Sequence, residues 1–161
     1  MEDWPAVVAK WFDDNDPDAS LTRVAPSGNS PERISSLERT LGVKLPEQMR
    51  KLYLAVDGFD LCDKPGEPPT FVKSVDAIPD YAKQERSYLS DTHREFAENY
   101  LPFIYFGNGD SAGYVWVSKG EEQTPVFVMV EHEEFRYDPD QSIDDFVRVM
   151  PENLAEMFAS T

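Results

Sequence analysis

The sequence predicts a single α+β domain over residues 1–161, and three observations point to this class. Apolar residues recur at helical spacing near the amino terminus, in the centre of the chain and near the carboxyl terminus. Glycine-rich turn signals separate short runs of β-branched and aromatic residues, the pattern of antiparallel strands joined by hairpins. The length of 161 residues and the 40% of apolar residues suffice for one hydrophobic core.

The first predicted helix lies near the amino terminus. Apolar residues occur at helical spacing from Trp4 to Trp11, so we expect a helix over residues 3–12. Both tryptophans should pack in the core. The acidic run DDNDPD follows, and it should end the helix because aspartate, asparagine and proline favour turns.

Residues 30–60 predict a pair of short helices. Ser30 can cap the first helix, and Gly42 should end it. A second helix should follow the Leu45-Pro46 joint, because proline is well accommodated in a first helical turn. The apolar face of this second helix would consist of Met49, Leu52, Tyr53 and Val56.

The centre of the chain predicts a loop, a broken helix and two strands. A loop rich in proline and glycine over residues 60–70 should lead into a strand over residues 71–75. Helical periodicity then extends from residue 78 to about residue 100, with a break near residue 90. A strand over residues 103–106 should follow this helical region.

A hairpin is predicted after this strand. The turn residues GNGD at positions 107–110 should lead to strands over residues 114–117 and 125–130. Residues 133–137 are expected to extend the same sheet.

The last predicted element is a helix. Ser142 and Asp145 form a capping box for a helix that carries Phe146, Val147 and Met150. Pro151 should restart it as a short helical piece that reaches Phe158.

The order and spacing of these motifs resemble the SUKH superfamily over residues 31–150. Phe59 is a departure, because a second glycine is common there in the superfamily. Four parts carry the resemblance: the Ile-x-x-Leu-Glu helix (Ile34, Leu37, Glu38), the Leu45-Pro46 joint before Leu52 and Tyr53, the Asp57-Gly58 stop, and looser matches over residues 71–78, 103–117 and 142–147.

This resemblance implies a fold and a class of function. A SUKH-like fold would be a mainly antiparallel, twisted sheet with the amino-terminal, central and carboxyl-terminal helices packed around it. Bacterial members of the superfamily are largely immunity proteins against toxins, and its eukaryotic members include a yeast cell-wall regulator.

The charge of the chain is strongly negative and unevenly distributed. The net charge is −16, which argues against DNA or RNA as a partner, because phosphate binding needs a basic surface. Residues 121–161 hold eleven acidic residues against two arginines, a net charge of −9. An acidic face could serve solubility alone, or it could attract a basic partner such as a nuclease.

Several chemical patterns in the sequence are incomplete. The run at residues 14–18 resembles the start of a calcium loop, but Ala19 and Ala25 replace the required glycine and glutamate. The GNGD turn lacks the lysine of a phosphate-binding loop. His93 and His132 belong to no zinc-protease motif. The sequence therefore predicts no catalytic residue, metal site or cofactor.

Two features indicate a cytoplasmic location. No apolar run is long enough to span a membrane, and the amino terminus MEDWPAVVAKWFDD lacks the basic region of an export signal. Cys62 is the only cysteine, which excludes an internal disulfide, and we expect it to be a small buried side chain.

We therefore expect a non-enzymatic immunity protein that neutralises a cognate bacterial toxin, a basic protein of the nuclease type, through an acidic surface. Tyrosines are included in the expected contact surface because binding hot spots favour aromatic residues within a polar rim. The expected partner-binding residues are Tyr114, Glu131, Glu133, Glu134, Tyr137, Asp138 and Asp140.

A regulatory or scaffolding domain is the alternative function. It would bind a cellular protein instead of a toxin, and the sequence separates the two poorly because both need a stable scaffold with variable loops. The expected contrast is in affinity, with a dedicated inhibitor binding at about nanomolar concentration or below. An enzyme is a remote third option.

Overall fold

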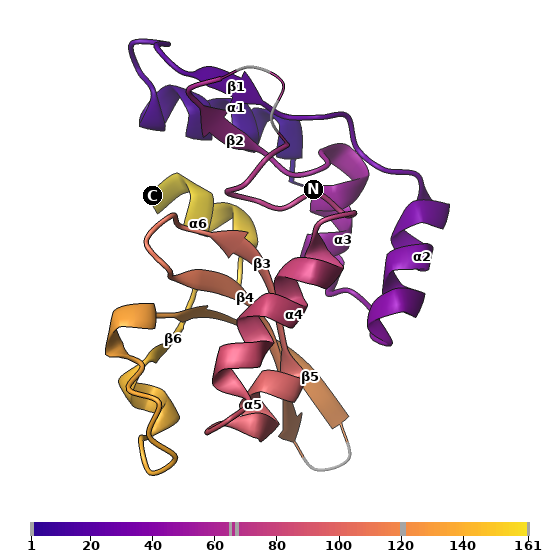
Figure 1. Ribbon diagram of the computed structural model, residues 1–161. Helices are drawn as coiled ribbons and strands as arrows, with labels where there is room; N and C mark the ends of the chain where they lie inside the picture. Colours follow the sequence, from indigo (N-terminus) through magenta and orange to yellow (C-terminus); the bar gives the residue numbers. More distant parts are fainter. Residues whose placement is uncertain (1, 65, 67, 120–121, 161) are drawn as a thin grey trace. The chain divides into compact units, whose positions relative to one another are not determined.

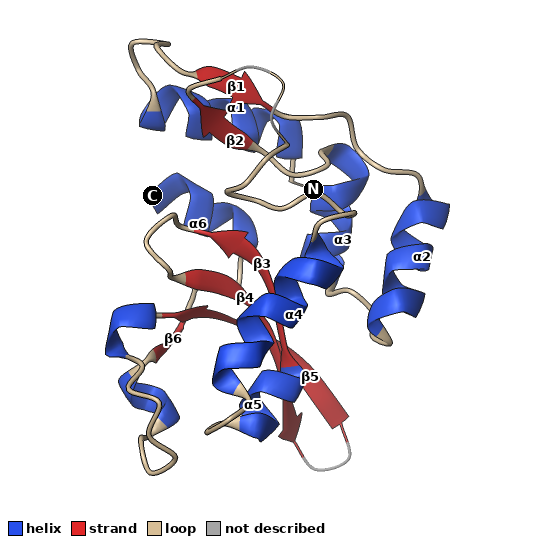
Figure 2. Ribbon diagram, in the orientation of Figure 1, coloured by secondary structure: helices blue, strands red, loops and turns tan. Residues whose placement is uncertain are grey.

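The computed structural model describes residues 2–64, 66, 68–119 and 122–160 (Figure 1). Helices and antiparallel sheets make up the fold (Figure 2), which confirms the α+β class.

Two compact units can be distinguished along the chain. The first consists of residues 1–77 and 153–161, and the second of residues 78–152. The single-domain organisation over residues 1–161 stays a prediction.

The first unit combines helices with a small antiparallel sheet in which β1 pairs with β2. The sequence did not reveal these two strands, because three residues are too few for a clear alternation of apolar and polar side chains. The elements of this unit are α1 (Trp4–Asn15), β1 (Thr22–Val24), α2 (Pro31–Leu41), α3 (Glu47–Ala55), β2 (Asp60–Cys62) and α6 (Leu154–Ser160).

Helix α1 extends three residues beyond its predicted end at residue 12. The side-chain amide of Asn15 donates a hydrogen bond to the backbone oxygen of Trp11 at 2.9 Å and completes the last turn. Trp4 and Trp11 are buried, as predicted. Phe59 replaces the common glycine of the superfamily, and its ring contacts Trp11 and Phe158 at centroid distances of 5.1 and 5.0 Å. The departure from the motif therefore supplies a core side chain.

The predicted caps of helix α2 are confirmed. The Ser30 hydroxyl accepts a hydrogen bond from the Arg33 N–H at 3.3 Å, and Gly42 takes a left-handed φ of 71°. Glu38, the acid of the Ile-x-x-Leu-Glu motif, is buried, and its Oε1 accepts the Leu45 N–H at 3.0 Å. This bond fixes the chain just before helix α3, so the motif acid has a structural role.

The Asp57-Gly58 motif joins three segments of the first unit. Asp57 Oδ1 accepts hydrogen bonds from the Asn29 side chain at 2.9 Å and from the Val75 N–H at 2.8 Å. The predicted strand over residues 71–75 is wrong, because only an isolated bridge between Phe59 and Val72 forms there. Cys62 is buried, as predicted.

The second unit consists of two helices and a four-stranded antiparallel sheet, whose strands lie in the order β3-β4-β5-β6. The predicted break in the central helical region is confirmed, since residues 90–93 separate the two helices. The elements of this unit are α4 (Ile78–Leu89), α5 (Arg94–Asn99), β3 (Tyr100–Tyr105), β4 (Ser111–Lys119), β5 (Glu122–Val130), the 3-10 turns η1 (His132–Glu134) and η2 (Ile143–Asp145), and β6 (Val147–Val149).

Helices α4 and α5 share a hydrophobic core with one face of this sheet. The predicted hairpin is present, although β4 and β5 are both longer than the predicted strands. The core between helices and sheet consists of Leu89, Phe96, Ala97, Tyr100, Val115, Val128, Val130, Phe135 and Phe146.

Two predictions for the end of the second unit are wrong. Residues 133–137 do not extend the sheet, because the chain leaves β5 in the turn η1. The predicted helix carrying Phe146, Val147 and Met150 is replaced by η2 and strand β6. The Ser142 side chain makes no capping hydrogen bond, and the β-branched Val147 and Val149 pair with β5 instead. A helix does follow Pro151, although it begins only at Leu154.

Candidate functional site

Most of the predicted contact residues lie in the connection between β5 and β6, residues 131–145, which we call the acidic segment. It contains seven acidic residues and a single arginine, Arg136. Glu133, Glu134, Asp138 and Asp140 are all exposed, and Glu131 is half-buried. The structure thus brings five of the predicted acidic contact residues together on one loop.

Gln141 holds the backbone of the acidic segment in place. Its side chain is buried, with Oε1 accepting the Arg136 N–H at 2.9 Å and Nε2 donating to the Glu134 backbone oxygen at 2.7 Å. The backbone oxygen of Gln141 lies 2.8 Å from Nε2 of His93, just before α5. Both the oxygen and the nitrogen of the buried Gln141 amide bond to the loop backbone, so the loop has a defined shape despite its length.

Two phenylalanines anchor the acidic segment and β6 to the core. Phe135 and Phe146 are buried, their ring centroids lie 4.9 Å apart, and the His93 ring contacts both of them. At the start of the segment, the His132 N–H donates to Asp110 Oδ1 at 2.8 Å. The exposed acids are therefore displayed on a loop that is fixed to the second unit at several points.

Tyr137 is an exposed aromatic residue within this acidic surface. Its side chain is 54% exposed, and its φ of 55° lies in the left-handed region that non-glycine residues rarely adopt. The ring packs beside Phe135 at a centroid distance of 4.6 Å, which gives it a preferred position. Tyr137 therefore meets the geometric requirement for a contact residue.

Tyr114 does not lie on this surface. It is only 5% exposed, and its ring stacks on Phe103 at a centroid distance of 6.0 Å. Burial raises the pKa of the Tyr114 hydroxyl to about 12. We correct the expectation for this residue, which belongs to the core and is left out of the contact surface.

A surface pocket of about 430 Å³ opens beside the acidic segment. Its two arginines are already engaged, since Arg136 pairs with Asp145 at 3.1 Å and Arg148 pairs with Glu131 at 2.9 Å. Four carboxylates outnumber these two cations, so the pocket suits a positively charged side chain from a partner. The pocket is lined by Glu133, Glu134, Arg136, Gln141, Asp144, Asp145 and Arg148.

Five of these lining residues were not among the predicted contacts: Arg136, Gln141, Asp144, Asp145 and Arg148. Asp144 and Asp145 belong to the same acidic run, so their charge was a usable signal, although they were assigned to a helix. Arg148 and Gln141 carried no such signal, because their positions depend on the pairing of β6 with β5 and on the contact with His93.

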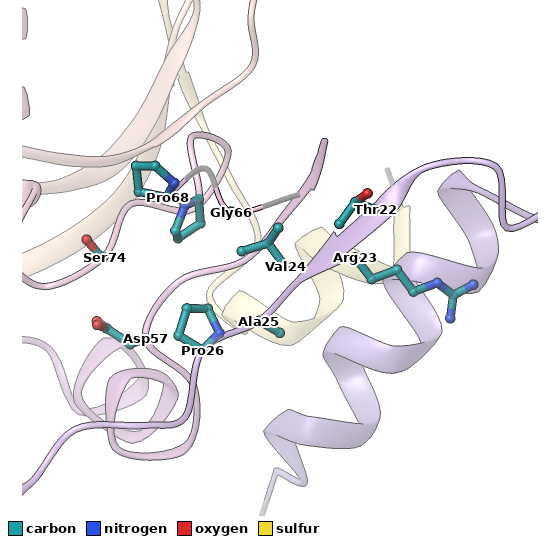
Figure 3. Close-up of a pocket in the computed structure, with 10 residues that line it drawn as sticks. Thr22, Arg23, Val24, Ala25, Pro26, Asp57, Gly66, Pro68 and Ser74 are labelled. Atoms are coloured by element: carbon teal, nitrogen blue, oxygen red, sulfur yellow. The ribbon is translucent and has the colours of Figure 1, made fainter. Parts of the chain in front are cut away.

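A second pocket of about 600 Å³ lies in the first unit (Figure 3). Its walls include Val24, Pro26 and Pro68. The Arg23 side chain points toward α1, where it pairs with Asp13 at 2.9 Å, and the Asp57 carboxylate is engaged by Asn29 and Val75. Its charged groups thus serve the fold, and we assign no chemistry to this pocket.

Among the described residues, no three histidine, cysteine, aspartate or glutamate side chains are grouped so that they could bind a metal ion. Within the same residues, no helix combines the length and the apolar character needed to cross a membrane.

Comparison with known proteins identifies the family. The sequence model of the SMI1/KNR4 family (SUKH-1) matches residues 28–149, a range that includes the α2–α3 motifs and the acidic segment. A search of curated proteins found no match. SUKH proteins are commonly immunity proteins and are generally non-catalytic. This match covers most of the length of the chain, and the chain therefore belongs to the SMI1/KNR4 family (SUKH-1).

Proposed function

We propose that this protein is a non-enzymatic immunity protein that neutralises a cognate bacterial toxin domain. The partner would be a basic protein of the nuclease type, whose cationic substrate cleft complements an acidic inhibitor. The observation that carries the proposal is the acidic segment itself, which carries exposed carboxylates and the exposed ring of Tyr137 on one loop fixed by Gln141.

The physical basis of inhibition would be steric and electrostatic. A negative surface accelerates encounter with a positive partner by about 10- to 1,000-fold at low salt. A fixed loop loses little conformational freedom on binding, so more of the contact energy appears as affinity. The contact residues of this proposal are Glu131, Glu133, Glu134, Tyr137, Asp138 and Asp140.

The function can be tested by capture and rescue. The tagged protein is used to capture basic proteins from its native cell at low salt, and each captured protein is then expressed with and without it. An immunity protein should restore growth against one of these proteins. Retention of partners without any growth rescue would favour the regulatory alternative and contradict toxin neutralisation.

Charge reversal tests the assigned surface. The double variant E133K/E134K should slow association with the captured toxin by about tenfold or more, and the difference should shrink at high salt. The double variant E95K/E98K is a matched control, because it changes the net charge equally at exposed positions of α5. Equal effects of both double variants would show that only the net charge matters and would remove the site assignment.

A further inference from the structure

The two outer edges of the four-stranded sheet differ in a way that bears on binding. An unpaired strand edge can accept an additional strand from another chain, because its backbone N–H and C=O groups are free. In the sheet order β3-β4-β5-β6, the outer strands are β3 and β6.

The β3 edge is closed by helix α4. The Arg86 side chain donates to the Tyr100 backbone oxygen at 2.6 Å, and the Tyr81 hydroxyl donates to the Ile104 oxygen at 3.1 Å. Pro102 lies between these two positions and has no N–H to offer. Side chains and a proline thus block the addition of a strand on this side.

The part of β5 that extends beyond β6 is also protected. The Met150 N–H donates to the Phe127 oxygen, so Phe127 directs its backbone groups toward the β6 side of the sheet. Backbone groups alternate along a strand, and Pro125, two residues earlier, therefore faces the same way. Because Pro125 has no N–H, this part of β5 is a poor template for another strand.

Within the described part of the chain, no proline and no side-chain hydrogen bond blocks the outer edge of strand β6. Val147 pairs with Val130 and Val149 with Val128, and the hydrogen bonds from Glu131 to Phe146 and from Met150 to Phe127 flank these two pairs. Both are therefore pairs without mutual hydrogen bonds, and the N–H and C=O groups of Val147 and Val149 point away from β5.

The surroundings of β6 are open and apolar at its end. Among the described residues, no further strand pairs with its outer edge. Val149 is 75% exposed, whereas the other exposed large hydrophobic residues reach at most 54%. A partner strand laid along β6 would gain backbone hydrogen bonds and would cover this side chain.

Charge determines which occupant fits this edge. Arg148 of β6 lines the 430 Å³ pocket together with Glu133, Glu134, Asp144 and Asp145, so the edge lies next to an excess of carboxylates. A second copy of this chain would bring another net charge of −16 to the same place, which opposes self-pairing. A basic segment is electrostatically complementary.

We infer that the outer edge of β6 accepts an extended, basic segment of the partner protein, which adds a fifth strand to the sheet. This inference rests on the proposed function for the identity of the partner, but the edge geometry stands without it. The bound segment would form backbone hydrogen bonds with Val147 and Val149, and a lysine or arginine side chain would enter the neighbouring pocket.

A synthetic probe tests the edge without the toxin. The probe is a ten-residue peptide of alternating lysine and valine, added to the full-length ¹⁵N-labelled protein and followed by NMR. The amide signals of Val147 and Val149 should shift, and their hydrogen exchange should slow, as their outward N–H groups become bonded. A peptide N-methylated at every second residue should bind about tenfold more weakly or not at all.

The variant V149P removes one outward donor and leaves the mutual bonds of the Met129–Arg148 pair in place. It should weaken peptide binding about tenfold, whereas V149T keeps both the N–H and the β-branched shape and should change it less than about threefold. Unchanged NMR spectra away from β6 would show that both variants are folded.

Three outcomes would overturn the inference. They are the absence of shifts at Val147 and Val149 up to millimolar peptide, equal binding of the N-methylated peptide, or shifts confined to the acidic segment. A failure of growth rescue would instead remove the proposed function, and it would leave the peptide result unaffected.

Discussion

The imidazole Nε2 of His93 lies 2.8 Å from the backbone oxygen of Gln141, and this contact connects the acidic segment to the start of α5. The residues are 48 positions apart in the sequence. Gln141 in turn bonds to the backbone of residues 134 and 136, so one imidazole supports the shape of the whole loop.

Removing this imidazole should loosen the acidic segment. We expect His93→Ala to lower the free energy of unfolding by about 1–2 kcal/mol, because the Gln141 oxygen loses its partner and the ring leaves a void beside Phe135. Amide hydrogen exchange of residues 134–141 should accelerate. The control is Thr92→Ala, which removes the hydroxyl next to His93 Nδ1 but keeps the bond to Gln141. Equal exchange in both variants would contradict this role.

Glu38 should be important for stability although it lies outside the proposed surface. Burial alone would raise its pKa, but hydrogen bonds from Lys44 and the Leu45 N–H, together with the charges of Lys44 and Arg50, hold the pKa below its usual value. We expect Glu38→Ala to cost about 3 kcal/mol and Glu38→Gln about 1 kcal/mol, since glutamine keeps an acceptor for Leu45.

The same carboxylate should make stability depend on pH. Its pKa is lower in the folded than in the unfolded protein, so the unfolded state binds more protons in the acid range. The stabilisation is thus present above the unfolded pKa and is lost as the pH falls through the folded pKa. Denaturant titrations should show a shallower acid decline for Glu38→Gln than for Glu32→Gln, an exposed control in the same helix. Parallel declines would contradict the assignment.

Substitution by alanine should cost different amounts of stability at two glycines. Both have a positive φ, 71° for Gly42 and 78° for Gly58. A Cβ at Gly42 would meet nothing within 4 Å, whereas a Cβ at Gly58 would lie 2.4 Å from the Val72 backbone oxygen. We expect Gly42→Ala to cost about 1 kcal/mol and Gly58→Ala about 3 kcal/mol or more. Thermal unfolding of both variants measures this difference, and equal melting temperatures would show that the chain adjusts at Gly58.

Tyr137 should separate binding from stability. Its positive φ is strained for tyrosine and relaxed for glycine, while its ring is half exposed. Tyr137→Gly should therefore change the free energy of unfolding by less than about 1 kcal/mol, and it should weaken toxin binding at least tenfold if the ring is a contact anchor. Tyr137→Phe retains the ring and serves as the control. Undiminished affinity in the glycine variant would exclude Tyr137 from the contact surface.

Much of the fold and part of the site follow from local sequence signals. The caps of α2 at Ser30 and Gly42, the break between α4 and α5 and the hairpin after β3 depend on residues close together in the chain. The acidic character of residues 131–145 is likewise a property of composition. Such features could be predicted because their physical causes act within a few residues.

Other features were decided only by contacts between distant residues. The valines after Ser142 pair with β5, although a capping box there favours a helix, because the neighbouring strand offers hydrogen bonds and apolar contacts that a local helix would lack. Tyr114 is buried for the same kind of reason, since its strand places it against Phe103. By itself, the sequence determined the charge and most of the helices. The tertiary structure decided which residues are exposed and which strand edge is open, because burial and pairing depend on partners that lie far away along the chain.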